Sequence, residues 1–245
     1  HVAWCWKAGG SGSSNEDGSI NTTSTSANVA GGFSISTYTG TGSNATVGHG
    51  LAVAPNLVIV KSRSGGEGWL VGSVQSVASM DFTDNLRLDG TTALVDEATS
   101  WNDLPPTASV VNIGTAGQSN QSSATYVMYC WHNVEGYSKV GSYTGNGNAD
   151  GIFIYTGFAP AYVIRKRTDS AASWLNYDRA RNSYNLANFG LQADTTAVET
   201  TGDNQIDFLS NGFKLRATDT YGNASGGKYI YMAFAETPFK NSNAR

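Results

Sequence analysis

Tyr126-Val127-Met128-Tyr129-Cys130-Trp131 is the stretch of this chain that decides its fold. Its nearly continuous apolar character is typical of a β-strand in the centre of a sheet or packed on both faces. The stretch recurs as Tyr229-Ile230-Tyr231-Met232-Ala233-Phe234, and Val2-Ala3-Trp4-Cys5-Trp6 matches its end. We therefore expect a repeated module that ends in this strand, and we expect the first residues to be the closing strand of a preceding copy.

A second landmark confirms the repetition within the sequence. Tyr38-Thr39-Gly40-Thr41-Gly42 recurs as Tyr143-Thr144-Gly145-Asn146-Gly147, at an offset of 105 residues. The same offset joins three further pairs, which are Pro55 and Pro160, Lys61 and Lys166, and Trp69 and Trp174. A period of this length indicates an array of domains, because solenoid units run to roughly 20 to 50 residues.

Short strands dominate each copy. The segments 56–61 and 161–166 are β-branched runs that each follow a proline, which can start a strand but rarely lies inside one. The segments 34–39 and 139–144 alternate and then enter Gly-x-Gly, where a positive φ is easily adopted. Strands at spacings near ten residues predict an all-β fold of β-sandwich or jelly-roll type.

The repeats predict five segments along the chain. Trp69 and Trp174 occupy the same place in both copies, so we interpret them as core residues. The Gly/Ser/Thr-rich stretch before the first complete copy cannot bury apolar area and predicts a linker. The segments are a closing strand (1–7), the linker (8–32), a first β-sandwich module (33–136), a second one (137–239) and a polar tail (240–245).

Composition argues against several classes of partner. Charged residues make up 14% of the chain, against about 25% on average, and the formal net charge is −4. Because Lys and Arg are scattered, we expect neither nucleic acid nor an anionic membrane surface as a partner. The apolar runs are also far shorter than the roughly 20 residues of a membrane helix. Cys5 and Cys130 occupy equivalent places in two copies, so we expect two buried thiols rather than a disulfide.

Residue types that support catalysis or metal binding are sparse. The three histidines are His1, His49 and His132, and no two of them have metal-ligand spacing. A Gly-x-Ser-x-Gly elbow is missing, and the glycines of 145–151 do not have dinucleotide-binding spacing. We expect no enzyme and no bound cofactor. Asn15-Glu16-Asp17-Gly18 and Asp203-Asn204 could donate oxygen atoms to Ca²⁺, although neither matches a complete calcium loop.

One enzymatic alternative stays open. Glycoside hydrolysis requires only two carboxylates that flank a cleft. No motif marks such a pair, and acidic side chains in loops are more simply interpreted as solvated. The candidates are Glu97, Asp103, Asp178, Glu199 and Asp203.

Glycan binding makes a smaller demand on the sequence. It needs an exposed aromatic face for a sugar ring and nearby polar side chains for the hydroxyls. Trp101, Tyr184 and Tyr221 lie in predicted loops beside Asn or Asp, where recognition residues tend to be found. Aromatic side chains also fill cores, so each of the three has a structural alternative.

The sequence resembles a repeated module of tailed-phage virion proteins, which include tail-fibre-like proteins of marine and freshwater phages. The resemblance rests on four stretches, together with the polar Asp17–Ile20 segment, and covers nearly the whole chain. These stretches are His1–Gly10, Tyr38–Leu51, Glu135–Lys139 and Asp207–Phe213. The acidic residue of the segment Trp174–Asp178 is Ser73 in the first copy, which argues against a role for Asp178 in every module.

The resemblance implies a structural protein of the virion surface or tail appendage, extracellular in the assembled particle. We expect a homo-oligomer, and by analogy with fibres a homotrimer, that binds host surface polysaccharide or other virion proteins. Two alternatives remain, a tailspike-like polysaccharide depolymerase and a purely architectural shaft, capsid decoration or extracellular fibre subunit.

Overall fold

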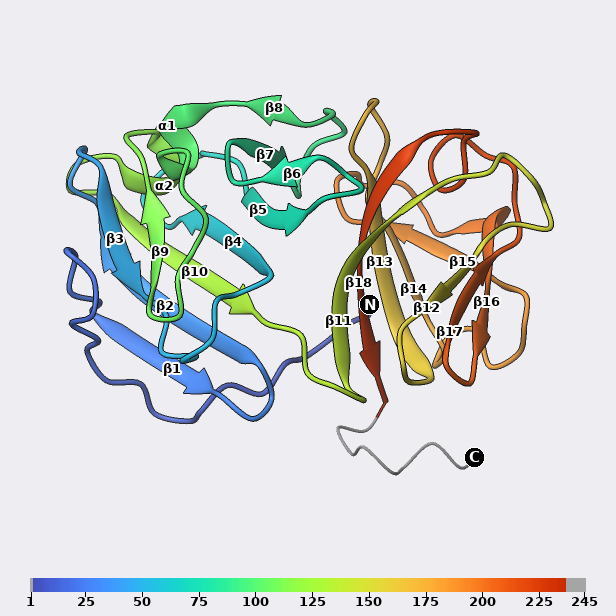
Figure 1. Ribbon diagram of the computed structural model, residues 1–245, viewed down its shortest axis with the longest axis horizontal. Coiled ribbons are helices and arrows are strands. Elements are labelled where there is room, and N and C mark those ends of the chain that lie inside the picture. Colours follow the sequence, from blue (N-terminus) through green and yellow to red (C-terminus); the bar gives the residue numbers. More distant parts are fainter. Residues whose placement is uncertain (1, 237–245) are drawn as a thin grey trace. The chain divides into compact units, whose positions relative to one another are not determined.

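The computed structural model describes residues 2–236, apart from the side chains of Asp203 and Asn204, and the chain divides into two compact units (Figure 1). The predicted all-β class is confirmed, with two single-turn helices among the strands. Unit 1 consists of His1–Val74, Asp81–Asn85 and Asp96–Asn133, and unit 2 of Gln75–Met80, Leu86–Val95 and Val134–Arg245.

The first sheet has eight strands in the order β1-β2-β10-β4-β5-β7-β8, with β6 paired to β5. A small sheet of β3 and β9 packs its apolar residues into the same core. The strands are β1 (Ser24–Asn28), β2 (Phe33–Thr39), β3 (Ala45–Gly48), β4 (Leu57–Ser62), β5 (Leu70–Gln75), β6 (Met80–Asp81), β7 (Asp84–Arg87), β8 (Val95–Asp96), β9 (Val110–Ile113) and β10 (Thr125–Trp131). The helices are α1 (Ala98–Trp101) and α2 (Gly117–Asn120).

The second sheet also has eight strands, in the order β11-β18-β13-β14-β15-β16-β17-β12. Its two end strands are joined by a side chain, since Lys139 Nζ of β11 donates to the Tyr155 carbonyl of β12 at 2.9 Å. The strands are β11 (Ser138–Thr144), β12 (Phe153–Tyr155), β13 (Pro160–Arg167), β14 (Leu175–Asp178), β15 (Ala187–Gln192), β16 (Thr200–Leu209), β17 (Gly212–Leu215) and β18 (Lys228–Ala235).

The two sheets repeat one topology. The closing strand β10 lies between β2 and β4, and β18 lies between β11 and β13, all pairs being antiparallel. The antiparallel pair β3 and β9 has its counterpart in β12 and β17. Each predicted strand at 34–39, 56–61, 125–131, 139–144, 161–166 and 228–234 is therefore present within one or two residues.

A pair of stacked tyrosines fixes each closing strand to the strand that opens the module. Tyr38 stacks on Tyr126 with ring centroids 5.2 Å apart, and Tyr143 stacks on Tyr229 at 4.8 Å. All four rings are buried, and each hydroxyl donates to a backbone carbonyl. Burial raises the pKa of these tyrosines, so they remain neutral donors.

A buried asparagine holds the Gly-x-Gly turn that follows. Asn120 accepts from the Thr41 amide at 2.8 Å and donates to the Ser43 and Gly114 carbonyls at 2.6 and 2.8 Å. Asn223 does the same in unit 2, accepting from the Asn146 amide and donating to the Asn148 and Ala217 carbonyls at 2.9 Å each. Both asparagines have no exposed surface. The repeated motif is therefore a corner of the chain held by side-chain hydrogen bonds, not only a turn.

The corner explains why glycine recurs in it. A Cβ at Gly40 would lie 2.3 Å from the Gln121 carbonyl, and one at Gly145 would lie 2.4 Å from the Ala224 carbonyl. No side chain fits such a close backbone approach.

We expect Asn120→Ala to destabilise unit 1 by about 3 kcal/mol, because it leaves one amide and two carbonyls of the corner unsatisfied. Hydrogen exchange of the β2 and β10 amides would measure the loss. Asn21→Ala, at an exposed asparagine of the same unit, is the control and should change exchange by less than about 0.5 kcal/mol. Equal effects of the two substitutions would contradict this role.

Three sequence expectations differ from the structure. The stretch 8–32 is not a plain linker, because it contains β1, which pairs with β2 over its whole length. Residues 2–9 form no strand; Lys7 and Gly10 instead accept hydrogen bonds from Asn28 and Ser26 of the β1 edge. Cys130 is buried as expected, but Cys5 is exposed. Backbone pairing with β2 orders the polar residues of β1, and Ile20 of the same stretch joins the unit 1 core.

The division of the chain also differs from the expected module boundary. The segment 86–95, which we call the arm, belongs to the sequence of the first repeat but to compact unit 2. Trp174 Nε1 donates to the Arg87 carbonyl at 2.7 Å, and the Ala172 amide donates to the Thr91 carbonyl at 2.9 Å. The Leu94 amide in turn donates to the Thr168 carbonyl at 2.8 Å. Unit 2 thus includes residues that precede it by half a repeat.

Lys166 secures the arm from inside unit 2. Its side chain has no exposed surface, and Nζ donates to the carbonyls of Thr91 at 3.2 Å and Arg167 at 2.9 Å. Burial lowers the pKa of Lys166 to about 8, Asp194 opposes this shift, and Arg167 adds to it.

The lowered pKa predicts a pH-dependent stability for unit 2. Between pH 8 and 10 the unfolded chain binds the Lys166 proton and the folded chain releases it, so stability should rise with pH in this window. The full gain is on the order of 3 kcal/mol. Lys166→Met should abolish the rise in chemical denaturation curves, whereas Lys61→Met, at the equivalent half-buried lysine of unit 1, should keep it. The same slope in both variants would contradict the assignment.

Candidate functional site

The three aromatic residues predicted to bind a ligand do not form one site. Trp101 is fully buried in the unit 1 core, with its ring edge-on to Phe82 at 5.2 Å. It cannot stack on a sugar, and that expectation is corrected. The single turn α1 places Trp101 under the sheet, beside Gly72, where a Cβ would lie 2.8 Å from the indole.

Tyr184 is the most exposed of the three. Its side chain is 87% exposed in the loop between β14 and β15. The loop is held from below by Asn182, which accepts from the Asn188 and Phe189 amides at 2.9 and 3.1 Å. Asn185 exchanges two hydrogen bonds of 2.9 Å with the backbone of Phe208 in β16. The loop therefore presents the Tyr184 ring to solvent from an anchored backbone.

An ion-pair triad anchors the first half of this loop. Arg181 Nε donates to Asp178 Oδ2 at 2.6 Å, and the Arg181 amide donates to Asp178 Oδ1 at 2.9 Å. The Arg181 guanidinium also pairs with Glu199. Two of the carboxylates proposed as catalytic candidates thus come together, but around one arginine, in an arrangement that anchors the loop.

Tyr221 lies at the opposite end of the second sheet. It is 42% exposed in the loop between β17 and β18, next to Gly222, whose amide donates to Asp219 Oδ1. Tyr184 instead lies near the turn between β16 and β17, at the other end of these strands. Tyr184 and Tyr221 cannot contact one short ligand together.

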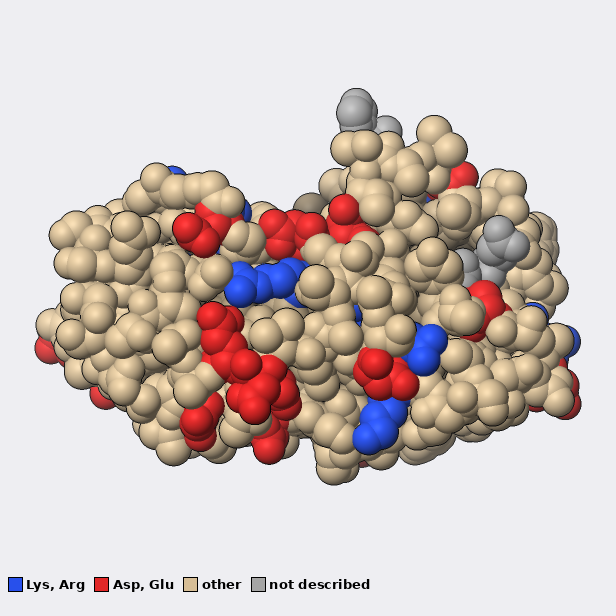
Figure 2. Space-filling view, turned by 90° about the horizontal axis from the view of Figure 1, so that it is seen from above, with Lys and Arg blue, Asp and Glu red and all other residues tan. Residues whose placement is uncertain are grey.

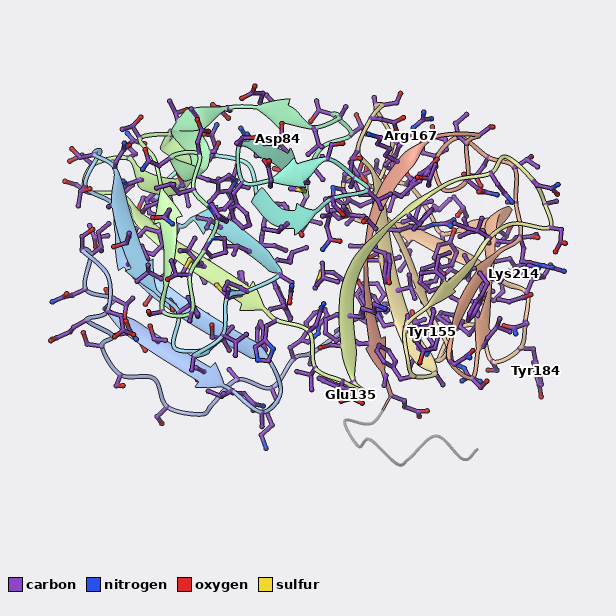
Figure 3. The ribbon with its side chains drawn as sticks, in the orientation of Figure 1. Asp84, Glu135, Tyr155, Arg167, Tyr184 and Lys214 are labelled. Atoms are coloured by element: carbon purple, nitrogen blue, oxygen red, sulfur yellow. The ribbon has the colours of Figure 1, made fainter. Side chains whose placement is uncertain are left out.

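The structure shows an exposed aromatic pair that the sequence analysis did not select. Phe153 and Tyr155 of β12 are 45% and 59% exposed, while Ile154 between them points into the core. Lys139 Nζ lies 5.4 Å from the centre of the Tyr155 ring. We call Phe153, Tyr155 and Lys139 the aromatic edge of unit 2. In Figure 3 Tyr155 lies on the lower part of unit 2, as does Tyr184.

Charged and hydrogen-bonding side chains flank the aromatic edge. Lys214 pairs across from Phe153 in the neighbouring strand β17, and its Nζ lies 2.6 Å from Asp150 Oδ1. Arg216 contacts Asp150 at 3.4 Å and Asp207 at 3.3 Å. Lys214 lowers the pKa of Asp150, which stays ionised. Aromatic rings and fixed polar groups therefore share one surface.

The equivalent surface of unit 1 is covered. In the counterpart strand β3, Thr46 and Gly48 flank the buried Val47 as Phe153 and Tyr155 flank the buried Ile154. The Ile20 amide donates to the Thr46 carbonyl at 3.0 Å, and the side chains of Ser19 and Thr46 bond to each other's amides. A Cβ at Gly48 would lie 1.6 Å from Asn15. The aromatic edge is thus a property of the second copy alone.

A sequence signal for this pair did exist. Phe153-Ile154-Tyr155 alternates, which is the pattern of a strand with an aromatic outer face, but three residues are too few for a firm strand prediction.

The remaining candidates have structural surroundings. Glu97 accepts hydrogen bonds from Asn85 and Ser100 at 2.9 Å each, which fixes the start of α1. His49 is buried, its Nδ1 accepts from the Leu51 amide, and burial lowers its pKa.

Asp103 is exposed beside α1, and the side chain of Asp203 lies outside the described part of the chain, as does His1. In residues 2–236 no group of three or more His, Cys, Asp or Glu side chains is placed to hold a metal ion, and Asn15 and Asp17 instead bond to each other.

Acidic side chains gather on unit 1 without forming such a centre. Burial raises the pKa of Asp84, and the charges of Asp81, Asp96 and Asp103 raise it further. On the face in Figure 2 acidic groups alternate with short basic stretches, and no continuous basic surface is visible. In the described residues no helix has the length and apolar character needed to cross a membrane.

The fold and the surfaces define an all-β protein built from two modules of the same topology, one of which has a bare aromatic edge. The chain belongs to the family described as a domain of unknown function, DUF7483, whose profile matches residues 1–238 and so spans both units. No curated protein and no solved structure matches the chain.

We expect Arg181→Met to destabilise the 178–189 region by about 3 kcal/mol, because it leaves the buried Asp178 carboxylate without its partner. Hydrogen exchange of the amides of 182–189 should rise, with little change in unit 1. Arg179→Met is the matched control, since Arg179 is exposed in the same loop. Exchange that stays at the wild-type level would show that the triad does not anchor the loop.

Proposed function

We propose that this protein is a structural and adhesive β-sandwich protein, of the tail-fibre-like kind that its sequence resembles, and that unit 2 binds a surface polysaccharide. The observation on which the proposal rests is the aromatic edge, with Tyr155 at 59% exposure above fixed charged groups. Aromatic faces supply apolar contact area to a sugar ring, and adjacent polar groups hydrogen-bond its hydroxyls.

The position of Tyr184 extends this surface. Asn185, its neighbour, bonds to β16, and β12 lies two strands further along the sheet. At about 4.8 Å per strand, the Asn185 anchor on β16 and Tyr155 on β12 lie roughly 10 Å apart in backbone position. This span suits an extended chain of sugars better than a single ring.

A binding role is favoured over hydrolysis by the surroundings of the carboxylates. Asp178, Glu199, Asp150 and Asp207 all contact an arginine or lysine. Lys214 lowers the pKa of Asp150, which makes it a poor general acid for a glycosidase leaving group. The carboxylates of Asp178, Glu199 and Asp207 face arginine side chains rather than each other across a cleft. A purely architectural shaft would not need an uncovered aromatic edge, and the covered strand β3 of unit 1 illustrates that alternative.

We expect Tyr155→Ala and Tyr184→Ala each to weaken binding to the host polysaccharide about tenfold, which corresponds to the roughly 1.4 kcal/mol of one aromatic contact. Isothermal titration calorimetry with the purified polysaccharide would measure the change.

The control for this experiment is Tyr221→Ala, an exposed tyrosine at the opposite end of the same sheet, which should bind like the wild type. Equal losses in all three variants, or none, would contradict the proposed surface. Release of reducing sugar by the wild-type protein, abolished by substitution of one Asp or Glu, would instead establish the depolymerase.

A further inference from the structure

The arm of the first repeat has a counterpart in the second repeat. Leu88-Asp89-Gly90-Thr91-Thr92-Ala93-Leu94 corresponds to Ala193-Asp194-Thr195-Thr196-Ala197-Val198, with one glycine fewer. In the first copy Leu94 is half-buried and its amide bonds to Thr168. In the second copy residues 195–199 are exposed, and Val198 is 88% exposed. The second arm thus has the sequence of a docking segment without the burial.

The surface that receives the first arm also has a counterpart. It consists of Lys166 near the end of β13 and of Thr168, Ala172 and Trp174 in the connection to β14. The offset of 105 residues maps these onto Lys61, Arg63, Glu67 and Trp69. The backbone frame is the same in both units. The Thr168 amide donates to the Lys228 carbonyl at 2.8 Å, and the Arg63 amide donates to the Thr125 carbonyl at 2.7 Å.

The residue types whose side chains donate hydrogen bonds to the first arm recur on this second surface. Lys166 Nζ and Trp174 Nε1 donate to arm carbonyls in unit 2, and unit 1 has a lysine and a tryptophan at the same positions. Lys61 and Trp69 are half-buried, whereas Lys166 has no exposed surface and Trp174 is 2% exposed. Lys61 Nζ donates to the Glu67 carbonyl of its own loop. A docked segment would account for the difference in burial between the two copies.

We propose that the exposed part of the second arm, residues 195–198, docks on the Lys61–Trp69 surface of unit 1 in a second copy of this chain, repeating between chains the contact that unit 2 makes with Thr91–Leu94. One copy contributes its arm and the other its receiving surface. Such a heterologous contact builds a ring if the rotation closes and a filament if it does not.

Cysteine cross-linking tests the proposed register. Val198 corresponds to Leu94 and Arg63 to Thr168, and the 2.8 Å hydrogen bond between Leu94 and Thr168 puts the corresponding Cα atoms within disulfide range. Val198→Cys and Arg63→Cys are made in separate, differently tagged chains, each also carrying Cys5→Ser because Cys5 is exposed. After mild oxidation of the mixture, we expect the mixed dimer to exceed either homodimer at least fivefold.

Matched variants decide the outcome. Val53→Cys, at a 50% exposed valine of unit 1, should form little mixed dimer with Val198→Cys. Equal yields from Val53→Cys and Arg63→Cys would overturn the proposal, because they indicate random collision. A monomeric disulfide in the double variant Arg63→Cys/Val198→Cys would also overturn it, since the arm would then dock within its own chain.

Solution association gives a second readout without cysteines. Sedimentation velocity of the wild type should show concentration-dependent association that Val198→Asp abolishes and Val53→Asp leaves unchanged. A wild type that stays monomeric at every concentration reached would overturn the proposal. Binding of polysaccharide by the monomer does not depend on this contact, so failure here leaves the proposed function untouched.

Discussion

Each module depends on the attachment of its closing strand to its opening strand through two stacked tyrosines and one buried asparagine. The rings of Tyr38 and Tyr126, and of Tyr143 and Tyr229, fill the core at the point where the chain leaves the sheet. Asn120 and Asn223 satisfy the backbone groups that this exit would bury without partners. Buried polar backbone must be paired, so one amide side chain at each corner allows the Gly-x-Gly crossing to lie inside the fold. The pairing of the closing strand with the opening strand in each module therefore depends on this corner.

The two copies keep this corner and differ at their surfaces. In the first copy β3 is covered by residues 15–20, whereas in the second the equivalent strand β12 is bare and bears Phe153 and Tyr155. The cores also differ: for example, the buried Arg165 lies over the Tyr177 ring where the first copy has Val60 and Gly72. A shared frame with divergent surfaces is what duplication permits, because the fold requires few residues and leaves the exposed positions open to change.

The sequence predicted those strands whose own side chains mark them, through apolar runs or a preceding proline. The closing strands were predictable because six apolar residues in a row have few other places to lie, and the prolines marked the starts of the strands near 57 and 160. It did not predict β1, whose Ser/Thr-rich residues are ordered by backbone pairing with β2. It also misplaced Trp101, since a tryptophan between polar neighbours gives no sign of the core that closes over it. Burial of this kind is decided by tertiary packing, which no local pattern records.

The arm that completes unit 2 has a consequence for biosynthesis. Residues 86–95 leave the ribosome some eighty residues before β13 and β14, at ordinary rates of roughly 5 to 20 residues per second. During those seconds the arm has no surface to pack on, so it must stay soluble by itself. Its composition limits aggregation during this time, because Asp89, Gly90, Thr91 and Thr92 interrupt the leucines. Because the arm is synthesised before the surface that it packs on, it can dock as soon as unit 2 folds.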